Sequence, residues 1–281
     1  MKLIYINKKI DYFICIIIFN IIININMFTR IIKELDTKIV YDQIAKQFDN
    51  TRYKMWPGVK KFLNSIDNNS YILDAGCGNG KNMLETQHTF YGIDTSNELL
   101  ELVKKKIINK INIIGLEQMS ITNMNKINDN TFDAVISIAV IHHLLDYTDR
   151  INAIKEFIRV CKKGGSILFT VWKLEDNNVY QNGKYLDTNN DDPSNDTNNL
   201  DEHNKIILWT DTETKKTYDR FYHFFTYDEI IKLIEQTNNE LKHIKYVIEI
   251  EKNNFTINNK SIIIQEIYEE ANNYYVRLNV I

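Results

Sequence analysis

The sequence predicts an α/β protein with a mostly parallel central sheet. Between residues 71 and 172, apolar runs of strand length alternate with amphipathic stretches of helix length. This alternation is typical of parallel strands joined by crossover helices. The first apolar run leads into a glycine-rich turn, DAGCGNG at 74–80, and the second ends in Asp94. Glycine turns and acids at strand ends are typical of α/β proteins that bind nucleotides.

Helices are expected before the first strand. From about residue 29 to residue 63, apolar side chains recur at the three- to four-residue spacing of an amphipathic helix. The stretch NTRYKMWP at 50–57 interrupts the pattern. Pro57 suits the first turn of a second helix, because its missing N–H would have no partner there.

The sheet itself is predicted from five apolar runs and the helices between them. The expected strands are 71–74, 90–94, 111–116, 132–139 and 166–172. Helices are expected over 97–107 and 148–161, the latter leading through Lys163-Gly-Gly165 into the fifth strand.

The last third of the chain begins with a polar insertion. Residues at about 176–204 are rich in Asn and Asp, which predicts disorder. Order is expected to return at 206–209 and again at 219–225, followed by a helix over 226–238. The strand-like runs 241–250 and 274–280 then suit an antiparallel hairpin at the edge of the sheet.

Composition limits the possible classes of protein. The net charge of −3 does not suggest a nucleic-acid binder, so such a role would need a local basic patch or a partner. The three cysteines lack paired-ligand spacing, which favours a reducing compartment without disulfides or structural zinc. The apolar run 12–23 is too short for a helix that spans a membrane. We therefore interpret residues 1–28 as an upstream extension of the gene model, with translation starting at Met27. The alternative is a signal-like segment or a weak membrane anchor.

The glycine-rich turn has the chemistry of a nucleoside site. Gly76, Gly78 and Gly80 let the backbone turn sharply and approach a ligand closely. Asp94, fourteen residues after Gly80, is placed to accept hydrogen bonds from a ribose diol. The pattern departs from the dinucleotide fingerprint, since an acid precedes the turn and the gap to the second acid is shorter. Asp74 is expected to brace the turn rather than to touch the ligand.

A pair of histidines follows the fourth strand. The stretch SIAVIHHL at 137–144 carries His142 and His143 to the carboxyl edge of the sheet, where α/β folds bind ligands. Adjacent side chains on a regular element point apart, so the pair is a poor metal chelate. One imidazole is expected to face the pocket while the other packs beneath it. A structural role for both is the alternative.

Several motifs together resemble one enzyme family. They are YDQIA at 41–45, TRYKMWP at 51–57, DAGCGNGK at 74–81, ISIAVIHH at 136–143, VWKLE at 171–175 and RFYH at 220–223. The glycine turn and the fourth-strand motif are typical of class I S-adenosylmethionine (SAM) methyltransferases in general. The TRYKMWP and RFYH pieces resemble the eukaryotic tRNA methyltransferases that esterify 5-carboxymethyluridine at the wobble position, like the methyltransferase domain of AlkB homologue 8.

The resemblance implies a Rossmann-like, seven-stranded class I methyltransferase sheet that ends in an antiparallel hairpin. The domain would span 29–281, with the insertion at about 176–204. SAM is the implied cofactor. The implied cofactor-binding residues are Asp74, Gly76, Cys77, Gly78, Asn79, Asp94, Thr95, Glu117, Ser120 and Ala139. The family usually has another acid after the third strand to contact adenine; here Glu117 or Ser120 takes that position, and Gln118 or Met119 is an equally fair assignment.

The implied reaction needs orientation more than proton transfer. A carboxylate is already ionised at neutral pH, so no general base is required. Arginine suits bidentate contact with a carboxylate. The candidate catalytic residues are Arg52, His142, Arg220 and Tyr222, assisted by His223. Arg52 serves equally well as a ligand of the SAM carboxylate, and Arg220 as a surface ion pair or a tRNA phosphate contact.

Partners and rival functions follow from the same motifs. The implied partners are the tRNA anticodon loop and a small zinc-binding activator protein, with the apolar run 111–116 as a possible edge strand for the activator. Lys215 and Lys216 are the first candidates for phosphate contacts, and Trp56 either stacks on a base or belongs to the core. We expect the cytoplasm, with the nucleus as a second compartment, and no stable membrane association. The rivals are a methyltransferase of a small or lipid-like molecule and a non-catalytic methyltransferase-like subunit.

Overall fold

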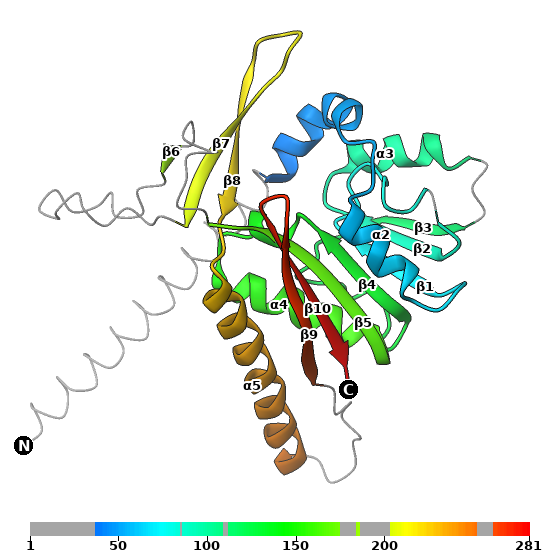
Figure 1. Cartoon of the computed structure of the whole chain (residues 1–281), viewed down its shortest axis with the longest axis vertical. Helices are drawn as coiled ribbons and strands as arrows, with labels where there is room; N and C mark the ends of the chain where they lie inside the picture. The colour runs from blue at the N-terminus through cyan, green and yellow to red at the C-terminus, as the bar shows by residue number, and fades with distance from the viewer. Residues whose placement is uncertain (1–36, 85, 109–111, 175–183, 186–202, 252–260) are drawn as a thin grey trace, which may run out of the picture.

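A seven-stranded sheet forms the centre of the computed structural model, which describes residues 37–84, 86–108, 112–174, 184–185, 203–251 and 261–281 (Figure 1). The strand order is β3-β2-β1-β4-β5-β10-β9. The strands are β1 (Tyr71–Ala75), β2 (Thr89–Asp94), β3 (Ile113–Gln118), β4 (Phe132–Ile138), β5 (Cys161–Trp172), β9 (Ile262–Glu270) and β10 (Asn273–Val280). The first five pair in parallel and β10 runs antiparallel to both neighbours, which confirms the predicted sheet.

Helices cover both faces of this sheet. Two of them, α4 (Tyr147–Val160) and α5 (Tyr227–Glu251), lie on one face, and α2 (Pro57–Asn64) and α3 (Asn97–Lys106) lie on the other (Figure 1). Each face has its own apolar cluster, so the sheet is buried on both sides, as parallel sheets usually are. Pro57 occupies the first turn of α2, as predicted.

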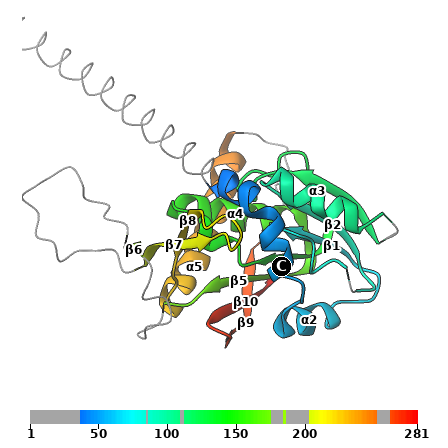
Figure 2. The ribbon, with the colours of Figure 1, turned by 90° about the horizontal axis from the view of Figure 1, so that it is seen from above.

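A further helix, over 37–51, lies above the carboxyl ends of the strands rather than against a face (Figure 2). The Asp42 carboxylate accepts hydrogen bonds from the Ser96 hydroxyl (2.6 Å) and the Glu98 N–H (3.2 Å), which fastens this helix to the start of α3. Because it spans the sheet edge where ligands bind in α/β folds, it forms a roof over that edge.

The C-terminal hairpin contains a different first strand from the one predicted. Residues 241–250 belong to α5, and β9 is the strand that pairs with β10. Ile230, Leu233, Ile234 and Leu241 keep helical spacing and pack on the apolar cluster beside α4, so the helical pattern continues through a run of β-favouring residues. The prediction of a strand there was wrong, whereas the strand over 274–280 is confirmed.

A second, three-stranded sheet projects beyond the carboxyl ends of the main strands (Figure 1). It consists of β6 (Lys184–Tyr185), β7 (Asn204–Thr210) and β8 (Thr217–His223), with β7 and β8 forming a long antiparallel hairpin. The predicted return of order near 206 is confirmed. Most of the polar insertion and the whole 1–28 extension lie outside the described residues. Within the described part of the chain, no helix is long and apolar enough to span a bilayer.

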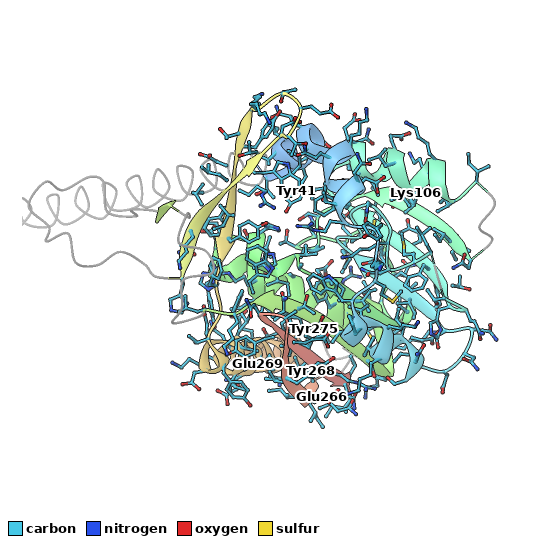
Figure 3. All side chains as sticks on the ribbon, turned by 45° about the horizontal axis from the view of Figure 1, so that its top comes forward. Tyr41, Lys106, Glu266, Tyr268, Glu269 and Tyr275 are labelled. Carbon is cyan, nitrogen blue, oxygen red and sulfur yellow. The ribbon has the colours of Figure 1, made fainter. Side chains whose placement is uncertain are left out.

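The C-terminal hairpin holds α2 in place beside the main sheet. Tyr268 on β9 and Tyr275 on β10 lie side by side (Figure 3), with their rings stacked 4.9 Å apart. The Lys61 ammonium of α2 lies 5.3 Å from the Tyr268 ring, and the Gly58 N–H donates to Glu270 (3.3 Å). These contacts fix Trp56, which immediately precedes α2.

Candidate active site

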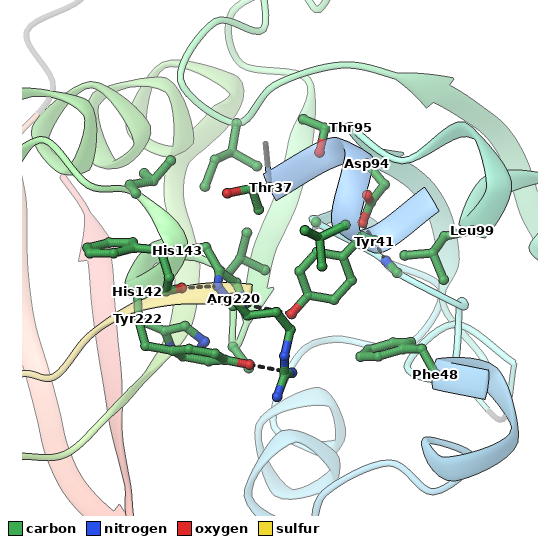
Figure 4. Close-up of a pocket in the computed structure, with 18 of the residues that line it drawn as sticks. Thr37, Tyr41, Phe48, Asp94, Thr95, Leu99, His142, His143, Arg220 and Tyr222 are labelled. Atoms are coloured by element: carbon green, nitrogen blue, oxygen red, sulfur yellow. Dashed lines mark hydrogen bonds between the residues drawn. The ribbon is translucent and has the colours of Figure 1, made fainter. Parts of the chain in front are cut away.

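A cavity of about 1040 Å³ opens where the sheet, the 37–51 helix and β8 meet (Figure 4). It is lined by the glycine turn after β1, the end of β2, the segment after β4, and residues 217–222 of β8. Both the predicted cofactor end and the predicted catalytic end therefore border one continuous space. Such a cavity is large enough for a drug-sized ligand and a reacting group.

The glycine turn requires glycine at its first position for two reasons. Gly76 has φ +84°, in the left-handed region, and a Cβ there would lie 2.4 Å from the Val140 side chain. The N–H groups of Gly76 and Cys77 both donate to the Ile93 carbonyl at 2.8 Å, which locks the turn against β2. Gly78, at φ +53°, lines the cavity, and a Cβ there would lie 3.6 Å from the Phe48 ring, an ordinary van der Waals contact.

Asp94 is held at the end of β2 by backbone donors. Its carboxylate accepts hydrogen bonds from the N–H groups of Gly78 (2.8 Å) and Ser96 (2.9 Å). Burial raises its pKa, and these two hydrogen bonds oppose the rise. Asp94 and Thr95 both line the cavity, so the carboxylate keeps an acceptor face towards a ligand.

Asp74 lies beneath the turn and does not line the cavity. It is fully buried, and neither carboxylate oxygen has a well-aligned hydrogen bond. Burial raises its pKa to about 7, while the Asn82 amide lowers it in part. This position agrees with a bracing residue under the turn rather than a direct ligand contact.

The structure separates the two candidates for the adenine end. Glu117 is directed away from the cavity, where it accepts a hydrogen bond from the Tyr91 hydroxyl (2.9 Å) and pairs with Lys126. Ser120 lines the cavity together with Met119 and Ile121. Glu117 therefore does not fit a cofactor contact, because its carboxylate is engaged on the outer side of β3.

The segment after β4 turns sharply into the cavity. Ala139 has φ +61°, which a non-glycine residue adopts rarely, and its N–H donates to the Thr170 hydroxyl (2.9 Å). A short 3₁₀ helix, Ile141–His143, then carries both histidines to the cavity wall. Local strain of this kind persists where the surrounding structure fixes it.

The two histidines are neutral and have different partners. His143 donates from Nδ1 to the Phe221 carbonyl (2.8 Å), so its Nε2 accepts from the Tyr41 hydroxyl (2.9 Å). His142 accepts at Nδ1 from the Trp172 N–H (3.3 Å), so Nε2 carries its hydrogen. Burial lowers the pKa of His143 to about 4 and that of His142 well below its usual range.

Arg220 and Tyr222 project from the same face of β8 into the cavity, since side chains two residues apart in a strand share a face. The Arg220 side chain is nine-tenths buried and donates to the Tyr222 hydroxyl (2.6 Å), as Figure 4 shows. Its Nε atom is buried without a partner. Tyr222 is stacked on Trp172 at 4.2 Å, and burial raises its pKa far above the usual value.

Arg52 directly follows the 37–51 helix and lines the same cavity. Its guanidinium is 5.8 Å from the Phe48 ring and 5.9 Å from the Trp209 ring. Among the described residues, the arginines with acidic partners are Arg150 and Arg159; Arg52 and Arg220 have none. The cavity thus contains two guanidinium groups without a counter-ion from the described chain.

His223 does not share the position of its neighbours. Because it points to the opposite face of β8 from Tyr222, it is outside the cavity, where it contacts Asn204 (2.7 Å) and Glu229 (2.6 Å). Its expected role beside the substrate is therefore not supported. The ligand-type atoms of three residues, His203, His223 and Glu229, lie within 4.8 Å of one another, which is a spacing that could hold a metal ion. The Arg150 guanidinium lies 3.8 Å from the Glu229 carboxylate, and its positive charge opposes a cation there.

Several cavity residues were not among the predicted site residues. Tyr41, Phe48 and Trp172 form an aromatic wall, and Lys81 places its ammonium 4.7 Å from the Trp56 ring. Burial and the nearby Arg52 charge lower the pKa of Lys81 to about 8. Tyr41 and Trp172 lie in family-like motifs, but only the tertiary contacts assign them to the cavity. Trp56 is half-buried: it packs against the apolar cluster of α2 and also lines the cavity, while its stacking on a base stays a prediction.

Comparisons with known proteins agree with this geometry. Residues 73–169 match the family model described as a methyltransferase domain. A SAM-dependent methyltransferase from Methanosarcina mazei superposes with a TM-score of 0.53 at 20% identity, covering 80% of this chain and 97% of that one. One from Clostridium acetobutylicum gives 0.54 at 17% identity, covering 85% and 98%. The chain therefore has the fold of SAM-dependent methyltransferases, and its residues 73–169 resemble a methyltransferase domain.

By sequence, the chain is similar to proteins that are named as tRNA methyltransferases. It is 44% identical over 138 residues to an Arabidopsis thaliana protein named tRNA (carboxymethyluridine(34)-5-O)-methyltransferase, covering 48% of this chain and 32% of that protein. The Schizosaccharomyces pombe protein of the same name is 39% identical over 142 residues, covering 50% and 58%. The matched region thus spans about a third to somewhat over half of these relatives.

The described residues fit SAM at one end of the cavity. Gly76, Gly78 and Gly80 have positive φ and carry no side chain, and Gly76 and Gly78 line the cavity. Asp94 offers a carboxylate fixed by two N–H groups. Both features match the needs of a nucleoside ligand with a ribose diol.

Proposed function

We propose that the chain methylates the carboxylate of 5-carboxymethyluridine at the wobble position of tRNA, giving the methyl ester. The observation that carries the proposal is Arg220, a buried guanidinium that faces the cavity without an acidic partner among the described residues. A buried cation without a counter-ion is costly. A carboxylate-bearing acceptor would provide that counter-ion, and the names of the similar proteins support the same substrate.

The residues around Arg220 suit orientation rather than base catalysis. SAM, when bound, supplies the methyl group as a sulfonium. In the proposed transfer an acceptor carboxylate oxygen would form a C–O bond with the methyl group while the C–S bond breaks and its electron pair stays on sulfur. The residues of this chain would then have no proton to move. Arg220 and Tyr222 would hold the carboxylate, and the neutral imidazole of His142 would complete the wall beside them. The reaction would neutralise the negative charge of the carboxylate and the positive charge of the sulfonium. Strong ion pairing would therefore stabilise the charged ground state more than the transition state, so one or two orienting cations are favoured over a larger cluster of them.

The cofactor end is assigned on the same basis. Asp94 would accept hydrogen bonds from the ribose hydroxyls, and the turn at Gly76–Asn79 would border the methionine end. Thr95 and Ser120 line the adenine end, and Ala139 the reacting centre. The carboxylate of Glu117 is left out of this assignment because it lies outside the cavity.

The β7–β8 hairpin is the proposed tRNA contact. Lys215 and Lys216 lie at its tip and are exposed, and the Lys216 ammonium lies 4.8 Å from the Tyr218 ring. The hairpin projects beyond the carboxyl ends of the main strands (Figure 1), and residues 217–222 of β8 line the cavity. Backbone phosphates near the anticodon loop would therefore meet these charges. The same turn also carries Asp211 and Glu213, so the argument depends on the two lysines themselves and not on a net positive charge at the tip.

A small zinc-binding activator is proposed as a partner on the β3 edge. β3 is the outermost strand of the main sheet, and Ile114 on it is 60% exposed. An exposed apolar edge strand favours pairing with another chain. If the partnership exists, co-expression with the activator should restore the solubility of the chain. A chain that is soluble and fully active when expressed alone would contradict the proposed partnership. We also propose a single methyltransferase domain over 29–281 and an enzyme of the cytoplasm, with the nucleus as a second compartment.

The deciding experiment uses the full chain, and the chain from Met27, with and without a candidate zinc-ribbon partner. Each is incubated with labelled SAM and tRNA that carries or lacks 5-carboxymethyluridine, and the RNA is digested to nucleosides. Label in the methyl ester alone, and only on modified tRNA, is the expected result. SAM binding without transfer, with the partner present, would contradict the proposal and favour a small-molecule acceptor.

A further inference from the structure

Trp209 of β7 lies close to both cavity-lining arginines, Arg52 and Arg220, neither of which has an acidic partner among the described residues. Its indole ring is 4.8 Å from the Arg220 guanidinium and 5.9 Å from that of Arg52. Both arginines line the cavity but come from different segments, Arg220 from β8 and Arg52 from the position directly after the 37–51 helix. An aromatic face attracts a cation and fixes the plane of a guanidinium, so one ring orients both groups.

Trp209 is itself fixed by a side chain from the roof helix. Its Nε1–H donates to the Gln47 side-chain oxygen (2.5 Å), and the Gln47 amide nitrogen donates to the Thr212 hydroxyl (2.8 Å). Gln47 therefore ties the β7–β8 hairpin to the helix that carries Arg52. That helix end also receives two hydrogen bonds from Asn79 of the glycine turn, at Asp49 (2.8 Å) and the Arg52 carbonyl (2.7 Å).

The charges define what this arrangement binds. Asp146, Asp149 and Asp219 line the same cavity, yet none forms an ion pair with either arginine. Arg220 uses Nη1 for Tyr222, and Arg52 donates only to the Thr51 carbonyl (3.3 Å). Two like charges on one ring repel each other, and an anion between them would relieve this repulsion.

We propose that Trp209 is the positioning residue of a two-arginine clamp, in which Arg52 and Arg220 together hold the acceptor carboxylate. This inference rests on the proposed function for the identity of that acceptor. It assigns Arg52 to the substrate rather than to the cofactor. Gln47 links the hairpin that carries Arg220 to the 37–51 helix, and the end of that helix also contacts the glycine turn. The clamp is therefore held at a fixed position relative to the proposed SAM site.

The clamp makes a charge-specific prediction that binding alone tests. Protein loaded with S-adenosylhomocysteine is titrated calorimetrically with two anticodon stem-loop RNAs, one carrying 5-carboxymethyluridine and one its neutral analogue 5-carbamoylmethyluridine. The wild type should prefer the acid by at least about tenfold, the minimum expected of charge-assisted hydrogen bonds. Trp209→Leu should abolish the preference with S-adenosylhomocysteine affinity unchanged, whereas Trp209→Phe should keep most of it.

Matched variants separate positioning from a loss of fold. Leu208→Ala alters the neighbouring, 39% exposed residue of β7 and should leave the preference intact. Gln47→Leu breaks the hydrogen bond to Trp209 without touching the ring, so it should lower the preference even if Trp209→Leu fails to fold. Equal wild-type binding of both RNAs, or a full preference in both Trp209→Leu and Gln47→Leu, would overturn the clamp. A clear acid preference without methyl transfer would instead contradict the proposed function and leave the clamp standing.

Discussion

Replacing Arg220 by methionine should separate activity from stability. Nη1 already donates to Tyr222 and Nε is buried without a partner, which leaves the Nε and Nη2 edge for a bidentate carboxylate contact. Two charge-assisted hydrogen bonds of about 1.5 kcal/mol each amount to about 3 kcal/mol. The value of kcat/KM for modified tRNA should therefore fall by about 10²-fold. SAM affinity should change by less than about twofold.

The same substitution removes a buried charge that has no counter-ion. Methionine fills similar space without that charge, so the free energy of unfolding should rise or change by less than about 1 kcal/mol. Urea denaturation, SAM calorimetry and tRNA kinetics on the same preparation measure all three quantities. Arg220→Lys, which keeps charge but not the planar fork, should fall between wild type and methionine in activity. A loss of about 3 kcal/mol in stability, or an equal loss of SAM and tRNA function, would refute the substrate role.

Three further predictions follow from the described contacts. Tyr222→Phe removes the hydroxyl that orients Arg220. The value of kcat/KM should therefore fall about fivefold to tenfold, and the free energy of unfolding should stay within about 1 kcal/mol of wild type. An unchanged kcat/KM in steady-state kinetics would show that the hydroxyl is dispensable. Gly76→Ala places a Cβ 2.4 Å from Val140 at φ +84°, which should cost about 2–4 kcal/mol in chemical denaturation, and a second change, Val140→Ala, should recover part of it. Burial alone would raise the pKa of Glu229, but hydrogen bonds from His203 and His223 outweigh it and lower the pKa to about 2. In the unfolded chain this carboxyl has its usual pKa of about 4.3, so its contribution to stability is complete above that pH and is lost as the pH falls towards 2. Glu229→Gln should therefore flatten the plot of unfolding free energy against pH in this range. Identical plots for the variant and the wild type would show that the Glu229 carboxylate does not cause this pH dependence.

The sheet was largely predictable because its signals are local. Five apolar runs, the glycine turn and Asp94 each report a strand or a strand end through their own sequence. The strand assigned to 241–250 shows the limit of that reasoning. The residues there favour a strand locally, and only packing of the preceding helical turns against the cluster beside α4 extends α5 through them. Intrinsic strand preference gives way to tertiary contacts of this kind.

The sequence by itself determined the class of fold, the glycine turn with its acid, and the residue types of a carboxylate site. Only the tertiary structure decided which of those residues share one space. It brings Arg52 and Arg220 to a single indole ring, places Tyr41 against His143, and directs Glu117 and His223 away from the cavity. The physical reason is that crossover connections and the position of the 37–51 helix bring together residues more than a hundred positions apart. Strand alternation then decides which side chains face the cavity, and a linear pattern does not encode which face each side chain will take.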